Sequence, residues 1–320
     1  MTKEAVGNKA HSSKKTVWQR VKKDIFGNYD LYLMILPVVV FYIIFAYMPM
    51  YGVQLAFRDF NPRLGIWDSP WLDPIFFNFQ RFFNSFVFNR LMFNTIAISL
   101  YSLAVGMPAS ILLALMLNEV RQAAFKKTVQ LVTYLPHFIS TVVMVGMITI
   151  FLSPRIGMVN NIIAFFGGDR ISFMTEPSMF KSIYVWSGVW QGVGFGSIIY
   201  LAALSSISPE LHEAATIDGA SRLRRIWHIN LPGITPTIMI LLILSAGGIM
   251  NVGFEKVFLM QNELTMSTSD VISTYVYRIG LLHGDFGFSS AVGLFNSVVN
   301  MILLVVVNFI ATRFGDTGLW

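Results

Sequence analysis

The chain contains no cysteine and few charged residues. Without cysteine it can form neither a disulfide framework nor a thiolate metal site. Charged residues make up 12% of the 320 positions, hydrophobic residues make up 55%, and the mean hydropathy is +0.62. This is too little charge to cover a water-soluble globule of this size, so the composition predicts a membrane protein.

Motifs that would hold a nucleotide, a metal ion or a catalytic cluster are also missing. No G-x-x-x-x-G-K-[ST] occurs, and "GVGFGS" at 192–197 lies inside an apolar run with no strand before it and no lysine after it. No Ser/His/Asp arrangement and no pair of carboxylates within an apolar run is found. We therefore expect no catalytic residue, no metal site and no cofactor in this chain. The histidines make no ligand spacing and are interpreted as surface or packing residues: His11, His137, His212, His228 and His283.

Long apolar runs are what the sequence has in excess. Six of them reach roughly 20 residues, the length that crosses about 30 Å of hydrocarbon as a helix. The runs are continuous rather than alternating with polar residues, which favours helices over a transmembrane barrel. The sequence thus predicts an all-α polytopic membrane protein with six transmembrane helices, near residues 31–54, 91–117, 128–152, 179–204, 233–254 and 289–312.

The distribution of charge predicts the orientation of these spans. If the N-terminus lies inside, the inner segments hold 14 Lys and Arg against 8 Asp and Glu, and the outer segments hold 9 of each. The net charge of +6 then lies wholly on the inner side, as the positive-inside rule expects. An even number of spans also places the C-terminus in the cytoplasm. Bases dispersed beside the membrane favour anionic lipid over nucleic acid as their partner.

The first 28 residues are expected to form a cytoplasmic basic tail, separate from a six-span domain at 29–320. The tail has no apolar core of its own, so it is not a signal peptide. From Lys14 onward, apolar residues recur on one helical side, which predicts an interfacial helix on the inner leaflet. A solvated basic tail is the alternative.

The predicted outer segments differ in character. The stretch 74–90 within the first segment, about 55–90, has too many Phe for solvent and too many polar residues for a span. An aromatic belt at the outer interface explains it, and a docking surface for an outside partner is the alternative. The second, 153–178, is interpreted as a loop rich in Gly and Asn, and the third, 255–288, as partly helical.

The stretch "ELHEAATIDGASRLRRIWHINLPGITP", which begins at Glu210, is a charged island between two apolar runs. Carboxylates in its first turn suit the positive end of a helix, and a glycine follows where a short helix would close. We expect two short helices rather than a flexible connector. Their limits are predicted at Ser208 or Pro209 for the start, Gly219 for the break, Pro232 for the stop, and Pro236 for the opening of the next span.

The residues of this island match a known pattern in order and spacing. They resemble the EAA loop of the membrane subunits of binding-protein-dependent ABC importers, with the pattern E-A-A-x-x-D-G-A, about nine residues, then L-P-x-x-x-P. Six spans with a cytoplasmic N-terminus also resemble the type I importer permease fold. The matching residues are Glu213, Ala214, Ala215, Asp218, Gly219, Ala220, Leu231, Pro232 and Pro236.

The resemblance implies that the loop at 205–232 couples the spans to a separate ATPase subunit, which binds the ATP and Mg. Glu213 would form an ion pair with that ATPase, and Gly219 would allow the sharp turn. Asp218 and Arg222 would shape the turn locally. The other implied partners are a second, similar permease subunit in a heterodimer, a second copy of the ATPase and an extracytoplasmic solute-binding protein, at a bacterial cytoplasmic membrane.

Other stretches, such as "GGIMNVGFEKVFLMQN" from Gly247 and the terminal "GLW", resemble importer permeases for oligosaccharides and polysaccharides, including those for alginate. This likeness makes alginate or a related saccharide the expected substrate. By similarity to the maltose-type permease, candidates for the sugar pathway are Gly192 and Phe195 in the fourth span and Asn251, Gly253 and Glu255 in the fifth. Amides can donate to and accept from sugar hydroxyls.

Two of these assignments have alternatives. Gly188, Gly192 and Gly196 stand four residues apart, so they could form a small-residue packing seam instead. Glu255 could pair with Lys256 or extend to the interface, and a carboxylate there suits a polyanionic substrate poorly. At the level of the whole protein, a channel or secondary transporter needs mid-membrane coupling charges or broken helices, of which the sequence shows few. A membrane-embedded enzyme lacks a catalytic cluster.

Overall fold

The computed structural model describes residues 27–315, 318 and 319, so the predicted interfacial helix from Lys14 lies outside the described residues. In this part of the chain the regular structure is helical, apart from one isolated bridge between Arg58 and Trp71. The contacts divide the chain into two units, which meet between Val53 and Gln54. The fold is that of an all-α polytopic membrane protein, as predicted.

The first unit is one apolar helical segment. It comprises α2 (Tyr29–Tyr42), a π turn (Ile43–Tyr47), α3 (Met48–Met50) and the start of a 3-10 turn (Tyr51–Phe57). The segment is long and apolar enough to cross a membrane, which confirms the span predicted at 31–54. Within this unit no residue of α2 is buried.

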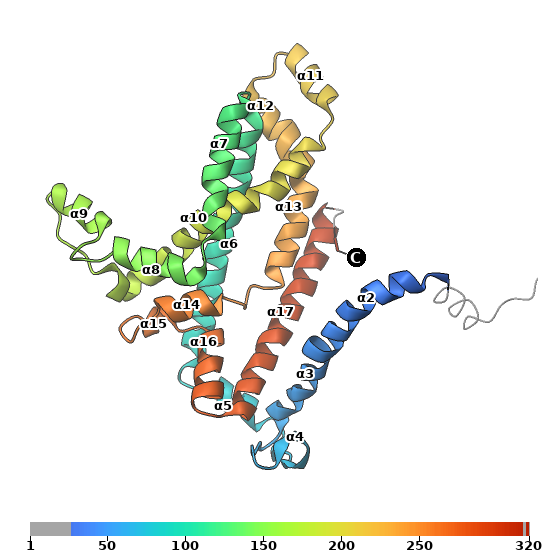
Figure 1. Cartoon of the computed structure of the whole chain (residues 1–320), viewed down its shortest axis with the longest axis vertical. Coiled ribbons are helices and arrows are strands. Elements are labelled where there is room, and N and C mark those ends of the chain that lie inside the picture. Colours follow the sequence, from blue (N-terminus) through green and yellow to red (C-terminus); the bar gives the residue numbers. More distant parts are fainter. Residues whose placement is uncertain (1–26, 316–317, 320) are drawn as a thin grey trace, which may run out of the picture. The chain divides into compact units, whose positions relative to one another are not determined.

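Four long helices organise the second unit: α6 (Phe88–Glu119), α10 (Pro177–Ser205), α13 (Leu231–Ala246) and α17 (Phe286–Gly315). Figure 1 shows α6 beside α10 and α13 beside α17, and these pairs pack directly. A Cβ on Gly196 would lie 2.8 Å from Ser110 Oγ, so a glycine there lets α10 approach α6 closely. The small-residue packing seam therefore holds for Gly196.

The prediction of the third span as one continuous helix is wrong. The stretch predicted at 128–152 is α7 (Ala123–Tyr134) with a 3-10 turn (Leu135–Phe138), followed by α8 (Thr141–Phe151) at an angle of 102°. Ile139 and Ser140 between them are extended, and Ser140 Oγ accepts a hydrogen bond from the backbone of α8. Pro136 before the break and this serine N-cap after it explain why one helix cannot continue. The described residues thus contain five long apolar helices, and six spans if the bent pair counts as one.

The fifth span begins earlier and ends earlier than predicted. Its helix runs without interruption from Arg222 through α12 (Arg222–Arg225) and a π turn (Ile226–Asn230) into α13, so Pro232 does not stop it and Pro236 lies inside it. The π turn just before Pro232 offsets the register of the backbone hydrogen bonds, which lets the helix continue past this proline.

The helix ends at Ala246 rather than at the predicted residue 254, and Gly247 and Gly248 then begin a turn. A Cβ on Gly247 would meet the Cδ1 methyl of Leu304 on α17, which would have to move, so glycine eases this close crossing. Asn300 of α17 accepts a hydrogen bond from the backbone N–H of Met250, 2.9 Å away. The chain from Asn251 to Gly253 is therefore held in a non-helical conformation against the bundle.

The segments between the long helices contain short helices. They are α4 (Gly65–Asp68), α5 (Phe77–Phe83), α9 (Met158–Phe165), α11 (Pro209–Ile217), α14 (Phe254–Met260), α15 (Met266–Ser269) and α16 (Ile272–Tyr277), with 3-10 and π turns at Phe173–Thr175 and Arg278–Leu282. The third outer segment is partly helical, as predicted. The prediction of 153–178 as a loop is wrong, because this segment contains α9. The buried side-chain amide of Asn160 makes hydrogen bonds with four backbone groups around this helix.

The aromatic residues of the first outer segment form a small core instead of lying wholly on a surface. Phe82 is fully buried, and its ring lies beside those of Phe88, Phe288 and Phe295. Phe86 nearby is 94% exposed. The prediction of an aromatic belt is therefore wrong for the residues of this segment that face the bundle, since α5 packs on α17.

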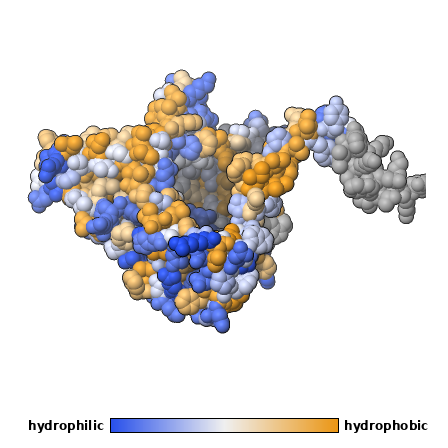
Figure 2. Space-filling view, turned by 60° about the horizontal axis from the view of Figure 1, so that its bottom comes forward, coloured by the Kyte–Doolittle hydropathy of each residue, from blue (hydrophilic) through white to orange (hydrophobic). Residues whose placement is uncertain are grey.

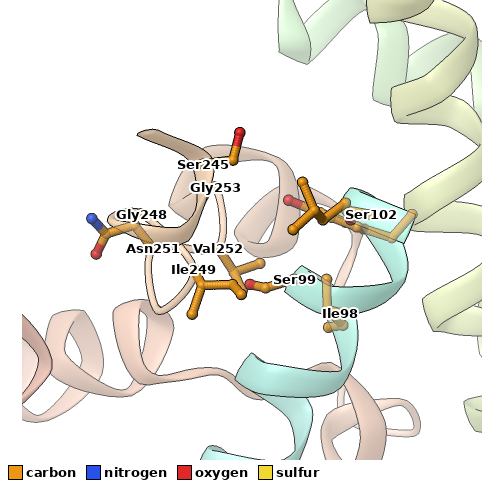
Figure 3. Close-up of a pocket in the computed structure, with 11 residues that line it drawn as sticks. Ile98, Ser99, Ser102, Ser245, Gly248, Ile249, Asn251, Val252 and Gly253 are labelled. Atoms are coloured by element: carbon orange, nitrogen blue, oxygen red, sulfur yellow. The ribbon is translucent and has the colours of Figure 1, made fainter. Parts of the chain in front are cut away.

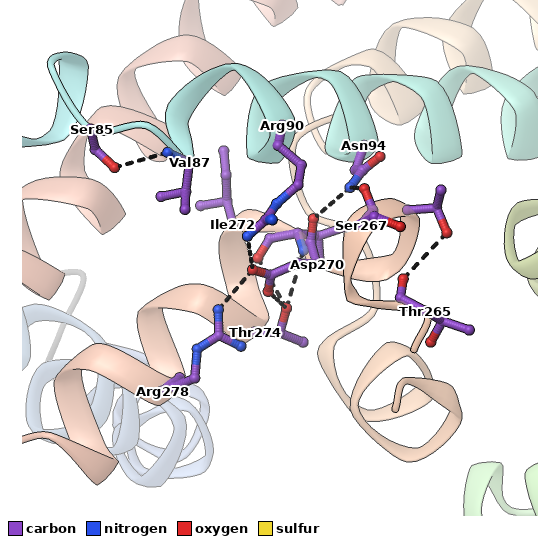
Figure 4. Close-up of polar contacts among 12 residues, drawn as sticks. Ser85, Val87, Arg90, Asn94, Thr265, Ser267, Asp270, Ile272, Thr274 and Arg278 are labelled. Atoms are coloured by element: carbon purple, nitrogen blue, oxygen red, sulfur yellow. Dashed lines mark hydrogen bonds and ion pairs between the residues drawn. The ribbon is translucent and has the colours of Figure 1, made fainter. Parts of the chain in front are cut away.

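A buried carboxylate anchors the third outer segment to α6 (Figure 4). The side chain of Asp270 is fully buried, accepts a hydrogen bond from Arg278 at 2.7 Å, and lies 3.6 Å from Arg90 of α6. Asn94 of α6 donates to the backbone carbonyls of Ser267 and Asp270. These contacts join residues about 175 positions apart in the chain and hold α15 and α16 on the N-terminal end of α6.

The surface of the second unit is divided by polarity. In Figure 2 hydrophilic residues gather at the end that comes forward, and apolar residues cover much of the flanks. Apolar flanks on long helices are what a membrane environment requires.

Candidate substrate pathway and coupling loop

The predicted coupling loop contains a complete helix-ending turn. α11 starts with Ser208 and Pro209, as predicted, and ends at Ile217. Gly219 follows with φ of +72°, a conformation that side chains with a Cβ rarely adopt. The N–H of Ala220 donates to the carbonyl of Ala215, and that of Gly219 to the carbonyl of Thr216, which is the Schellman arrangement.

A side chain also ties the two halves of the loop together. Arg225 donates from Nη1 to Thr216 Oγ1 at 2.7 Å, across the turn. Arg225, which the resemblance does not single out, makes this local link. On the far side of the turn, Ser221 caps α12 through its hydroxyl.

No residue that the structure describes covers the exposed face of the loop. Glu213 and Asp218 are exposed, and the apolar side chains of Leu211 and Ile217 are 54% and 87% exposed. An exposed apolar face with acidic groups on a short helix is typical of a docking element.

A single continuous helix joins the loop to the bundle. Gly219 is three residues before the start of α12, from which helix continues to Ala246. Near its base the buried Asn230 donates to Glu119 at the end of α6, 3.4 Å away. The loop is thus connected rigidly to α13, with a contact to α6.

Two adjoining cavities lie between α6, α10 and the turn that follows α13. The first, of about 290 Å³, is lined by Ser99 and Ser102 of α6 and by the 245–253 turn (Figure 3). The second, of about 390 Å³, lies between α6 and α10 and is lined by Gly188, Gly192 and Gln191, with Lys256 of α14. Both have Ser102 and Tyr184 in their walls.

The structure brings three of the five predicted pathway residues to these cavities. Gly192 lines the second, and nothing lies within 4 Å of where its Cβ would be. Asn251 and Gly253 line the first. Phe195 lines neither, because its ring stacks on that of His137 with centroids 4.0 Å apart. Exposed Glu255 lines neither cavity.

Asn251 borders its cavity mainly with its backbone rather than with its side-chain amide. Figure 3 shows its side chain directed away from Ser99 and Ser102. Its Oδ1 accepts hydrogen bonds from Asn296 at 2.9 Å and Asn300 at 3.2 Å, both on α17. The amide thus serves to hold the 247–253 turn against α17.

Lys256 enters the second cavity without a carboxylate partner. Its Nζ donates to the backbone carbonyl of Tyr184 at 2.6 Å and lies 4.5 Å from the centroid of that ring. Among the described residues the ion pairs involve only Asp270 and Asp285 as acids, so the predicted pair with Glu255 does not form. Burial, which disfavours the charged form, lowers the pKa of Lys256 from 10.5 to about 8.

The cavity residues that the sequence did not single out include Ser99, Ser102 and Tyr184. Polar residues within otherwise apolar runs were the available signal for them. The bend at Ile139 belongs to the same region, because Gln191 donates to the carbonyl of Ile139 at 2.8 Å. Non-helical backbone within a membrane protein is stable where such partners satisfy it.

Long apolar helices, cavities between them and an exposed two-helix loop are features of a transport permease. The comparison with known families agrees. Residues 106–316 match the family described as "Binding-protein-dependent transport system inner membrane component", and the chain belongs to this family. It is therefore a multi-pass protein of the bacterial cytoplasmic membrane and a permease subunit of a binding-protein-dependent importer.

Individual relatives cover nearly the whole chain. Protein LplB of Bacillus subtilis (strain 168) is 43% identical over 290 residues, which is 91% of each chain. The polygalacturonan/rhamnogalacturonan transport system permease protein YteP of the same organism is also 43% identical, over 91% of this chain and 90% of its own length.

Solved structures show the same fold. A chain in the crystal structure of a bacterial alginate ABC transporter, in complex with a periplasmic protein that holds an alginate pentasaccharide, superposes with a TM-score of 0.86. It is 43% identical, and the match covers 94% of this chain and 100% of that one. The carbohydrate branch of the permeases, expected from the sequence, is supported by these likenesses.

Proposed function

We propose that this chain forms half of the translocation pathway of an ATP-driven importer of oligosaccharides or polysaccharides, with alginate or a related saccharide as substrate. The partners are a second, similar permease subunit, two ATPase subunits that bind ATP and Mg, and an extracytoplasmic solute-binding protein. ATP hydrolysis belongs to the ATPase subunits. Both termini lie in the cytoplasm, with 29–320 as the membrane domain.

The rigid link between the exposed helix α11 and α13 is the observation that supports this proposal most. A separate ATPase that binds α11 displaces it, and the turn at Gly219 transmits the displacement into a bundle helix. Glu213 is the residue that contacts the ATPase through an ion pair, while Ala214 and Ala215 present the small surface that lets α11 enter a groove. Asp218 and Ala220 maintain the turn. Access then switches between outside and inside as the bundle shifts.

The proposed sugar pathway runs along the two cavities. Gly192 lets sugar approach the backbone of α10, and Gly253 does the same beside Tyr184. Serine hydroxyls of α6 offer hydrogen bonds to sugar hydroxyls. A saccharide substrate is supported by relatives whose names specify polygalacturonan, rhamnogalacturonan and alginate.

Replacement of Glu213 by Arg tests the coupling step. We expect this variant to lose most of the ATPase that copurifies with the permease and to lose ATP-driven uptake in proteoliposomes, because the charge at the docking helix is reversed. Copurification and saccharide uptake are measured on the same preparations.

Glu210→Arg provides the matched control. Glu210 is an exposed carboxylate in the first turn of the same helix but lies outside the matching E-A-A pattern. The Glu210→Arg variant should keep its association with the ATPase and most of its saccharide uptake. Unchanged assembly and uptake in Glu213→Arg would refute the coupling role of this loop.

A further inference from the structure

The second cavity contains one uncompensated positive charge. The residues that line it from α6 and α10 are neutral, and Lys256 supplies its only ammonium group. No carboxylate of the described residues lies within 4.0 Å of Lys256 Nζ. A partly buried charge without a counter-ion is unfavourable and is usually paired when the site is occupied.

The ammonium group also retains unused donors. It has three N–H groups, and the hydrogen bond to the carbonyl of Tyr184 uses one. Gly188 permits this position, because a Cβ there would lie only 3.1 Å from Nζ. The lysine is therefore held at the cavity wall by the backbone of α10, with two donors left for a ligand.

We propose that this cavity binds a sugar residue that bears a carboxylate, and that Lys256 is the group that recognises the carboxylate. The inference rests on the proposed import of alginate or a related saccharide, and it adds the residue that distinguishes an acidic sugar from a neutral one. A single ammonium is matched by the single negative charge of a uronate, while Ser102 and Ser110 offer hydrogen bonds to ring hydroxyls. Glu255 lines neither cavity.

The test compares a charged and a neutral trisaccharide with otherwise equal rings. The complete importer, with its ATPase, second permease and binding protein, is reconstituted in vesicles. Uptake of trigalacturonate and of its methyl ester is measured for the wild type, Lys256→Gln and Lys256→Arg. We expect Lys256→Gln to lower the ratio of acid to ester uptake roughly 10- to 100-fold, the effect of losing one hydrogen bond to a charged group. Lys256→Arg should keep most of the ratio.

Lys181→Gln is the matched control. Lys181 also has its ammonium group over an aromatic ring, that of Phe93 on α6, but it lines neither cavity. Its uptake ratio should equal that of the wild type. A purely structural role of Lys256 would reduce both uptakes equally and leave the ratio unchanged, which would overturn the inference.

Stimulation of ATP hydrolysis by the binding protein separates this inference from the proposed function. If stimulated hydrolysis persists and Lys256→Gln keeps the wild-type ratio, recognition by Lys256 is wrong while saccharide import stands. If the wild type imports only the ester, the inference is also wrong. If it imports only the acid, loss of that uptake in Lys256→Gln with hydrolysis retained supports the inference, and retained uptake overturns it. If it imports neither trisaccharide, the inference fails, whereas the saccharide proposal stands or falls with the uptake of alginate oligosaccharides.

Discussion

At the scale of single residues, the most constrained charge of the described chain is the carboxylate of Asp270. It has no exposed surface, contacts two arginines and a threonine, and joins α6 to the third outer segment. Asp285 makes a second ion pair, with Arg81, but both side chains are partly exposed. The two aspartates thus make comparable contacts in different surroundings.

Asp270→Asn is expected to destabilise the protein by about 3 kcal/mol, because Arg278 and Arg90 lose their buried counter-charge. Asp285→Asn should cost less than about 1 kcal/mol, since exposed ion pairs contribute little. The measurement is thermal unfolding of the purified importer in detergent. Equal shifts in Tm for the two variants would contradict the role assigned to Asp270.

Residue roles were predictable where they depend on neighbours in the chain and not where they depend on distant ones. Gly219 follows a short helix, and its positive φ was expected from the order of residues. Asn251 was expected to face sugar, but its oxygen is occupied by two amides 45 and 49 positions away. Nothing in one sequence indicates that such partners lie on the next helix.

At the scale of helices, neighbouring glycines on α10 have different purposes. A Cβ on Gly194 would collide with the backbone carbonyl of Thr133 on α7, whereas Gly192 faces open space. The first glycine permits helix packing, and the second borders a cavity. The regular spacing of Gly188, Gly192 and Gly196 did not reveal Gly194 as the tightest contact.

Gly194→Ala should therefore destabilise the protein by roughly 1–3 kcal/mol, because the backbone of α7 must move to accept the methyl group. Gly192→Ala should leave stability unchanged or slightly raised, as alanine favours a helix more than glycine does. Thermal unfolding of both variants decides the matter. If Gly192→Ala were the more damaging of the two, the assignment of packing and cavity faces on α10 would be wrong.

The limits of the helices were harder to predict than their existence. Apolar runs located the first, second, fourth and sixth spans, because hydrophobic length alone determines what can cross a bilayer. The bend after Phe138 escaped prediction, since the carbonyl of Ile139 is satisfied by Gln191, 52 positions later. The helix end predicted at Pro232 was wrong for a related reason, because a π turn before this proline lets the helix continue past it.

At the scale of the whole molecule, the absence of cysteine permits a direct test of orientation. Asn84 and Gln122 are exposed amides just before and just after α6, and 32 helical residues separate the two sides. If α6 spans the membrane, cysteines at these positions must lie on opposite faces. The positive-inside distribution places Gln122 in the cytoplasm.

We expect Asn84→Cys to react with a membrane-impermeant maleimide in intact cells stripped of any outer membrane, and Gln122→Cys to react only after the membrane is permeabilised. The wild type supplies the unlabelled background. The reverse pattern would overturn the predicted orientation, with its cytoplasmic termini, and would place the α11 loop outside, where no ATPase could reach it. Labelling of both cysteines in intact cells would mean that α6 does not cross the membrane at all.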